Sequence, residues 1–135
     1  VLKWIPGKNE TKVEEARGLY AMMLEGRCQI WSPKFLLVEV LNILIKKRRA
    51  NAEIVSAAMD VLLRGQIKYW EMESGQVRDL EKLMRRCDLT AYDAQYLLLA
   101  KQLGCRLVSY DEELLKVKDL VVKAKDVVQH PRVRN

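Results

Sequence analysis

The sequence predicts an α/β fold, namely a three-layer α/β/α sandwich with a parallel sheet. The first observation is that short apolar runs alternate along the chain with longer stretches of helical apolar periodicity. Strands that alternate with helices pair in parallel, and the helices then cover both faces of the sheet. The second observation is size, because 135 residues with 50% hydrophobic content suit one domain with a substantial core.

Local stop and start signals divide the first half of the chain into elements. Gly26 ends an amphipathic helix, and Ser32 with Pro33 provides an N-cap followed by a proline at the first helical position. A polar turn then separates the next two helices. In order, we expect a helix over residues 10–26, a strand over 28–31, helices over 33–49 and 52–64, and a strand over 67–72.

The second half repeats this pattern. Thr90 can cap a helix, and Gly104 suits the left-handed position that follows a helix. The apolar run after Gly104 predicts a buried strand. In order, we expect helices over 76–86 and 91–103, a strand over 105–109, a helix from Glu112 and an edge strand over 120–124. Residues 1–128 therefore form a single domain, and 129–135 a polar tail that we expect to be disordered.

Two aspartates are expected at the same edge of the sheet. Asp93 lies in the first turn of the helix 91–103, and Asp111 follows the strand 105–109. At about 1.5 Å per helical residue and about 3.3 Å per strand residue, the two elements have similar lengths, so the chain returns to the edge it left. Open parallel sheets place their sites at this carboxyl edge. Each aspartate also has a simpler interpretation, because Thr90 and Asp93 fit a capping pattern and Asp111 can cap the next helix.

Glu39 is a third acid, and it lies inside an apolar run. The run spans residues 35–45, and Glu39 and Asn42 are its only polar members. The two are three positions apart and share one helix face. A carboxylate among aliphatic side chains is difficult to bury unless it is paired or binds a metal ion. The alternative is that this face points to water.

A basic stripe continues from Glu39 along the same predicted helix. Glu39, Asn42, Lys46 and Arg49 follow a 3-4-3 spacing, which places them on one face of an α-helix. RNA phosphates could contact Lys46 and Arg49 there. The alternative is that the basic residues only stabilise the helix C-terminus through its dipole, by a few tenths of a kcal/mol each.

Taken together, these motifs resemble the PIN-domain nucleases, and most closely the small VapC-type toxins of toxin–antitoxin pairs. The resemblance covers nearly the whole chain, and it depends on the order and spacing of the motifs rather than on any one of them. The residues that carry it are Glu39 with Asn42, Tyr92-Asp93-Ala94 leading into Leu97 to Ala100, and Leu107-Val108-Ser109-x-Asp111 with Leu114.

The resemblance implies a metal-dependent ribonuclease. Glu39, Asp93 and Asp111 would be catalytic and would bind Mg²⁺ or Mn²⁺, for which oxygen ligands are suited. Ser109 would be a catalytic hydroxyl that orients a carboxylate or a water, and Asn42 would support the ligands without touching the metal. RNA would be the substrate, and a second copy of the chain and a small antitoxin protein would be its partners.

The chain departs from the family pattern at its start. Family members open with a hydrophobic strand that ends in a catalytic aspartate, and a segment similar to Val1-Leu2-Lys3-Trp4 follows that strand. The sequence begins at Val1 without the strand or its acid. We therefore expect that the natural chain extends upstream, and that the sheet has a gap with unpaired backbone on both sides of it.

Composition agrees with these expectations. The net charge of +6 and the sequence pI of about 9.3 suggest an anionic partner. Cys28, Cys87 and Cys105 are an odd number without close spacing, which indicates neither a disulfide framework nor a zinc knuckle. The single histidine, His130, excludes His-rich metal sites and a core Ser-His or Cys-His nucleophile. No membrane-length apolar stretch or signal peptide is visible, so we expect a cytoplasmic protein without membrane contact.

The first predicted helix bears on the oligomeric state. Its apolar residues lie on nearly all sides of one turn, more than a single core-facing stripe needs, which suggests a homodimer. The alternative is a helix buried on two sides within one chain. The residues concerned are Leu19, Tyr20, Met22 and Met23.

Three functions are therefore compatible with the sequence. The first is a metal-dependent endoribonuclease of the VapC type. The second is a non-catalytic PIN module for nucleic-acid binding or assembly. The third is an unrelated doubly wound domain whose acids are only helix caps.

Overall fold

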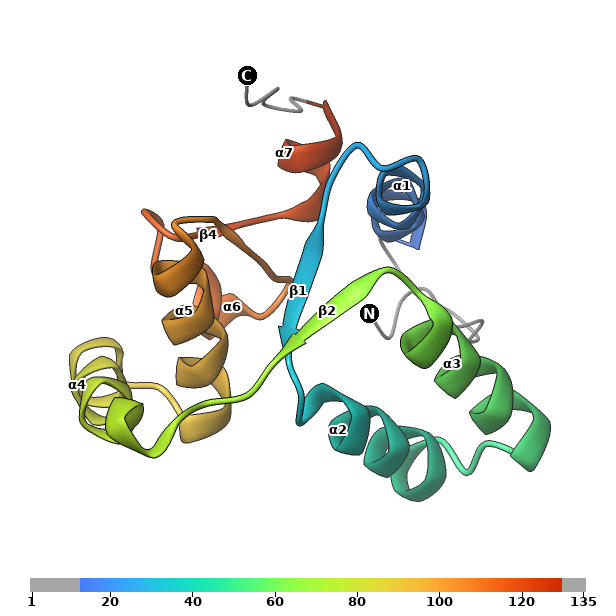
Figure 1. The fold of residues 1–135 in the computed structure, drawn as a ribbon, viewed down its shortest axis with the longest axis horizontal. Helices are drawn as coiled ribbons and strands as arrows, with labels where there is room; N and C mark the ends of the chain where they lie inside the picture. The colour runs from blue at the N-terminus through green and yellow to red at the C-terminus, as the bar shows by residue number, and fades with distance from the viewer. Residues whose placement is uncertain (1–12, 130–135) are drawn as a thin grey trace.

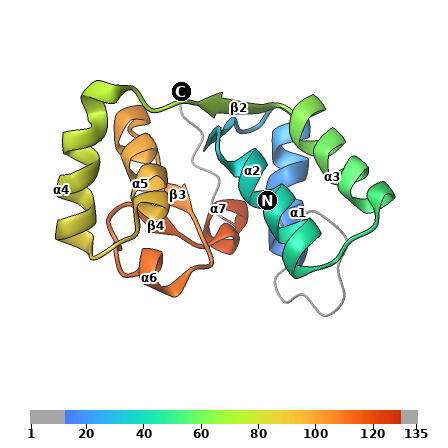
Figure 2. The same ribbon diagram turned by 90° about the horizontal axis from the view of Figure 1, so that it is seen from below.

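The computed structural model describes residues 13–129, which fold as an α/β sandwich with parallel strands (Figures 1 and 2). Predicted elements that extend into residues 1–12, as well as His130 and the tail after it, lie outside the described residues. In chain order the elements are α1 (Val13–Leu24), β1 (Ile30–Pro33), α2 (Leu36–Asn42), the π-helix η2 (Ile43–Lys47), α3 (Ala52–Arg64), β2 (Ile67–Trp70), the 3₁₀-helix η3 (Ser74–Gln76), α4 (Val77–Cys87), α5 (Ala91–Leu103), β3 (Leu107–Val108), α6 (Glu112–Leu115), β4 (Val121–Val122) and α7 (Ala124–Gln129).

The described strands form two parallel pairs instead of one continuous sheet. β1 pairs with β2, and β3 pairs with β4. Between the pairs lies a cavity of about 750 Å³, which is lined by Trp31 and Ser32 of β1 and by Leu107 and Val108 of β3. The cavity therefore separates the two strand pairs.

Two apolar cores lie on opposite sides of the junction between the strand pairs. In both views, α1, α2 and α3 gather on one side and α4, α5 and α6 on the other (Figures 1 and 2). One core includes Met23, Val40, Leu44 and Leu62, and the other includes Leu80, Leu97, Leu98 and Leu114. The cavity and the candidate site lie where the two halves meet.

The helix predicted over residues 33–49 is shorter and less regular than expected. Ser32 and Pro33 belong to β1, where they pair with Tyr69 and Trp70 of β2. The helical signal of Ser-Pro was therefore overridden by strand pairing. After α2 the backbone hydrogen bonds span five residues, as in a π-helix. The Arg48 N–H donates to the Ile43 carbonyl at 2.9 Å. The helix has ended before residue 49.

The last two predicted strands are also shorter than expected. The strand predicted over 105–109 is reduced to β3, whose two residues are half-buried because they line the cavity. The strand predicted over 120–124 is reduced to β4, and α7 follows it. Gln129, where the predicted tail begins, is the last residue of α7. The wider domain boundaries stay a prediction.

The apolar side chains of α1 are buried against other parts of the same chain. Leu19, Met22 and Met23 are 9%, 5% and 0% exposed. The helix is therefore buried on more than one side, and the excess of apolar residues gives no support to a homodimer. No helix among residues 13–129 combines the length and the apolar character that crossing a bilayer requires.

Gly65, which ends α3, is expected to be required for stability. A Cβ atom at this position would lie 2.3 Å from the Val61 carbonyl oxygen, which is closer than packing allows. Gly65→Ala should therefore destabilise the fold by about 1–3 kcal/mol, as overpacking does. Gly75→Ala is the matched control, because its Cβ would meet no atom within 4 Å. Urea denaturation of both variants measures the difference, and equal midpoints would contradict the expected clash.

Candidate active site

Glu39 is held by a tyrosine from a distant part of the chain. The Tyr96 hydroxyl on α5 donates a hydrogen bond to Oε2 of Glu39 on α2 at 2.9 Å, across 57 positions of sequence. Burial raises the pKa of the Glu39 carboxyl, the Tyr96 hydrogen bond lowers it, and the negative charge of Asp93 raises it further. The expectation that Glu39 is paired is therefore supported over the alternative of a carboxylate facing water, since the side chain is half-buried and bonded to Tyr96.

Asp93 lies near Glu39 and also completes a helix cap. Thr90 is the N-cap of α5, and its Oγ1 accepts a hydrogen bond from the Asp93 backbone N–H at 3.2 Å. The same hydroxyl donates to Oδ2 of Asp93 at 2.7 Å. The capping interpretation of Asp93 is therefore correct as local geometry. The negative charge of Asp93 also acts on Glu39, so Asp93 has a second interaction besides helix capping.

Asp111 and Ser109 organise the loop after β3. Oδ1 of Asp111 accepts hydrogen bonds from the backbone N–H groups of Glu113 and Leu114, at 2.9 and 3.2 Å, and so caps α6. Oγ of Ser109 accepts from the Asp111 backbone N–H at 3.0 Å. Ser109 thus orients the loop that carries Asp111, by a hydrogen bond to the backbone rather than to a carboxylate.

Each of the three acids uses only one of its oxygens for these bonds. Among residues 13–129, the hydrogen bonds involve Oε2 of Glu39, Oδ2 of Asp93 and Oδ1 of Asp111. A carboxylate has two oxygens with about four acceptor sites, so the other oxygen of each acid remains available to a ligand. All three acids and Ser109 line the cavity between the strand pairs.

The acids do not form a ready-made three-ligand cluster within the described residues. No group of three His, Cys, Asp or Glu side chains among residues 13–129 is close enough to hold a metal ion. Glu39 and Asp93 alone are nevertheless a suitable donor pair for Mg²⁺ or Mn²⁺. Magnesium usually keeps several waters and binds proteins through one or two carboxylates. The donor chemistry of the pair therefore fits such an ion, and Asp111 lines the same cavity.

The other predicted site residues lie outside this arrangement. Asn42 is exposed and does not line the cavity. The stripe through Lys46 and Arg49 assumed a continuous α-helix, and that assumption was wrong. Lys46 belongs to the wider π-helix η2, and Arg49 follows it with a φ of 52°. A contact of Lys46 and Arg49 with RNA stays a prediction.

Sequence reasoning missed Tyr96 as a member of the site. Its ring packs edge-on against Phe35, with the centroids 5.4 Å apart. Ser32 acts on the Tyr96 hydroxyl by lowering its pKa, and Ser32 is a buried polar side chain, 3% exposed, whose hydroxyl donates to the Pro33 carbonyl at 3.2 Å. The available signal was spacing, because Tyr96 is three positions after Asp93 and so shares its helix face.

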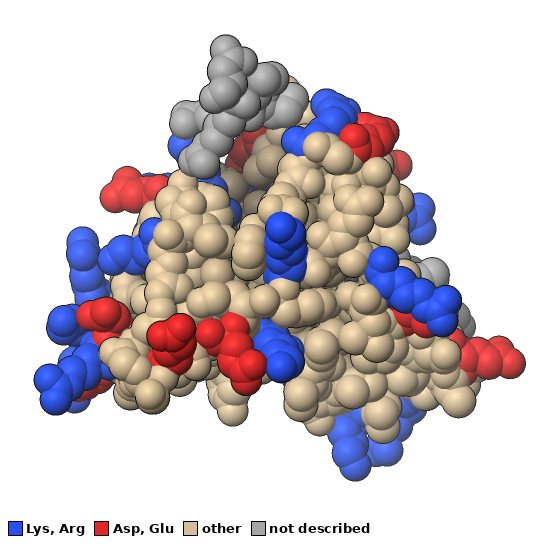
Figure 3. Space-filling view, viewed as in Figure 1, with Lys and Arg blue, Asp and Glu red and all other residues tan. Residues whose placement is uncertain are grey.

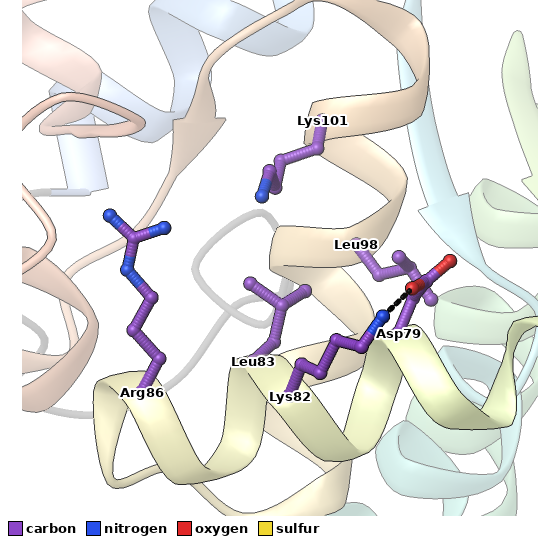
Figure 4. Close-up of a pocket in the computed structure, with 6 residues that line it drawn as sticks. All are labelled: Asp79, Lys82, Leu83, Arg86, Leu98 and Lys101. Carbon is purple, nitrogen blue, oxygen red and sulfur yellow. Dashed lines mark hydrogen bonds and ion pairs between the residues drawn. The ribbon is translucent and has the colours of Figure 1, made fainter.

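A second, basic pocket lies between α4 and α5 (Figure 4). Lys82 is bound to Asp79 at 3.3 Å, while Arg86 and Lys101 extend toward the pocket over Leu83. Lys101 is about 12 Å along α5 from Asp93, at the opposite end of the helix. On the face that Figure 3 shows, basic side chains also gather over α4, and uncharged surface covers much of the middle. This pocket is separate from the acids.

The comparisons with known proteins give one match. A family model described as PIN domain matches residues 1–120 of the 135-residue chain. No curated protein and no solved structure matches.

Proposed function

The chain belongs to the PIN-domain family, and from this premise we propose that it is a metal-dependent endoribonuclease that hydrolyses RNA phosphodiester bonds. One observation carries the proposal. The carboxylates of Glu39 and Asp93, which come from α2 and α5, line one cavity together with Asp111 and Ser109, and the charge of Asp93 acts on Glu39. Two acids would repel each other at this position, and a divalent cation between them would relieve the repulsion.

In this mechanism the protein mainly holds oxygen ligands in place. Tyr96 fixes one oxygen of Glu39, and Thr90 fixes one oxygen of Asp93. The remaining oxygens would bind Mg²⁺ or Mn²⁺, with Asp111 contributing directly or through a water. A bound cation of this kind lowers the pKa of an attacking water and neutralises charge that develops on the phosphate.

The remaining residues would position the substrate. Ser109 supports the loop of Asp111, so that both line the side of the cavity formed by β3. Asn42 would support the ligands from α2, and Lys46 with Arg49 would contact the RNA backbone. The positive net charge of +6 favours an RNA partner in a sequence-independent way.

Because its motifs resemble those of VapC-type toxins, we further propose that the chain is a toxin of this type. A small antitoxin protein would then be a partner, and the active form would be a homodimer. The dimer rests on the family resemblance, because α1 is buried within one chain.

A non-catalytic PIN module is the second candidate function. The observation that favours it is the lack of a three-ligand cluster among residues 13–129. Such a module would bind RNA or assemble with a partner, and a cation would not change the RNA. The family match overturns the third function, an unrelated doubly wound domain.

The proposed activity is tested by incubating the full-length protein with structured RNAs in the presence of Mg²⁺, Mn²⁺ or EDTA. Fragments should appear with either cation and not with EDTA. The same preparations are examined for RNA binding by a mobility shift. Binding without cleavage under every condition would favour the non-catalytic module, and neither binding nor cleavage would contradict both functions.

A further inference from the structure

The contact between Tyr96 and Glu39 suggests a role that goes beyond the proposed acids. The Tyr96 hydroxyl joins α5 to α2 through a hydrogen bond of 2.9 Å to Oε2 of Glu39. Glutamate has three side-chain torsions, and an unrestrained carboxylate would sample several positions at the cavity wall. A fixed donor at one oxygen restricts that freedom and determines where the second oxygen lies.

Tyr96 is itself held from two directions. Its ring lies edge-on to Phe35, which precedes α2, at a centroid separation of 5.4 Å and an interplanar angle of 76°. Its hydroxyl lies on the side of the buried Ser32 of β1, which lowers the Tyr96 pKa. Three elements, α2, α5 and β1, therefore meet at one phenol, so its position is set by the packing of the fold.

Asp93 belongs to the same arrangement. It lies three residues before Tyr96 on α5, on the same face, and its charge reaches Glu39. Because Thr90 holds Asp93 and Tyr96 holds Glu39, both carboxylates are restrained relative to α5. A restrained pair binds a small cation more tightly than a mobile pair, since less conformational freedom is lost on binding.

We propose that Tyr96 is a positioning residue, whose hydroxyl orients the Glu39 carboxylate toward a divalent cation that Glu39 shares with Asp93. This inference rests on the proposed function, but it concerns cation binding rather than cleavage. The Tyr96 hydroxyl would act as supporting hydrogen bonds do at other metal sites. Removal of such a bond lowers metal affinity by about 10- to 100-fold.

Tyr96→Phe tests the proposal, because it removes the hydroxyl and keeps the ring that packs on Phe35. Mn²⁺ binding is measured by titration calorimetry or electron paramagnetic resonance on the full-length protein without RNA. We expect the Mn²⁺ affinity to fall by about 10- to 100-fold. RNA cleavage at saturating Mn²⁺ should fall less than at limiting Mn²⁺, because added cation compensates for weaker binding.

Tyr92→Phe is the matched control. Tyr92 also lies edge-on to Phe35, at 5.7 Å, but it is 63% exposed and its hydroxyl makes no hydrogen bond among residues 13–129. The control should leave Mn²⁺ affinity unchanged. Ser32→Ala is a second test, which removes the buried hydroxyl that acts on Tyr96 and should weaken Mn²⁺ binding to a smaller extent.

The outcomes separate this inference from the proposed function. Unchanged Mn²⁺ affinity in Tyr96→Phe, with or without a lower melting temperature, would mean that the hydroxyl is only structural and would overturn the positioning role. An unmodified protein that binds Mn²⁺ but leaves RNA intact would overturn the nuclease and not the positioning role. An unmodified protein that binds no Mn²⁺ would overturn both.

Discussion

Replacing Glu39 with Gln and Asp93 with Asn together is expected to reduce RNA cleavage by more than about 100-fold, because even supporting residues at metal sites contribute about 10- to 100-fold. Both replacements keep the shape of the side chain and its capacity to accept hydrogen bonds from Tyr96 and Thr90. They remove the two negative charges that a divalent cation would neutralise. Initial rates of RNA cleavage over a range of Mn²⁺ concentrations measure the effect.

The melting temperature of the same double variant provides a second measurement. Mn²⁺ should raise the melting temperature of the unmodified protein, because a ligand that binds the folded state stabilises it, and should no longer do so in the variant. A matched control neutralises two exposed acids that form surface ion pairs, Glu71→Gln with Asp60→Asn. An equal loss of cleavage in the control would mean that the effect is one of general charge.

The raised pKa of Glu39 predicts how the melting temperature of a Glu39 variant changes when no metal ion is present. Burial raises the pKa of Glu39 above that of the unfolded chain, so the ionised form is less favourable in the folded protein. The stability that the protonated form provides is present at low pH and is lost as the pH rises through the raised pKa. Without cation, the Glu39→Gln substitution should therefore raise the melting temperature at neutral pH, and less so at pH values below the unfolded pKa.

Leu62→Ala is expected to destabilise the fold by about 2–5 kcal/mol, the range for removing a buried leucine from a core. Leu62 is 0% exposed on α3, within the core that also contains Met23, Val40 and Leu44. Packing around it is complete on all sides, so truncation leaves a cavity that rigid neighbouring helices fill only in part. Urea unfolding followed by circular dichroism measures the change.

The neighbouring residue supplies the control for this second prediction. Leu63 follows on the same helix and is 63% exposed. Leu63→Ala has the same effect on helix propensity, but it creates no cavity, so the change should stay within about 0.5 kcal/mol. Similar losses in the two variants would contradict the burial that the structure gives to α3.

Some elements were determined by their local sequence. The helices predicted over 52–64 and 91–103 have those bounds in α3 and α5. Asn51 caps α3 by accepting a hydrogen bond from the Ile54 N–H, and Thr90 caps α5 in the same way. Gly104 takes the left-handed conformation that ends α5. These signals act over a few residues, so they can be recognised before the fold is known.

Other features were decided by contacts between distant residues. Ser32 and Pro33 can start a helix or end a strand, and pairing with β2 selected the strand. The two aspartates had capping roles that the sequence allowed, but their position beside one cavity depended on the packing of α5 and β3.

By itself, the sequence determined the α/β class and the well-capped helices and predicted three candidate acids, because periodicity, caps and residue type are local properties. Only the tertiary structure decided that these acids line one cavity and what holds them. Glu39 and Tyr96 are 57 residues apart, and no local preference predicts their hydrogen bond. That contact requires α2, α5 and β1 to pack together, since each helix alone would leave the carboxylate and the phenol in water.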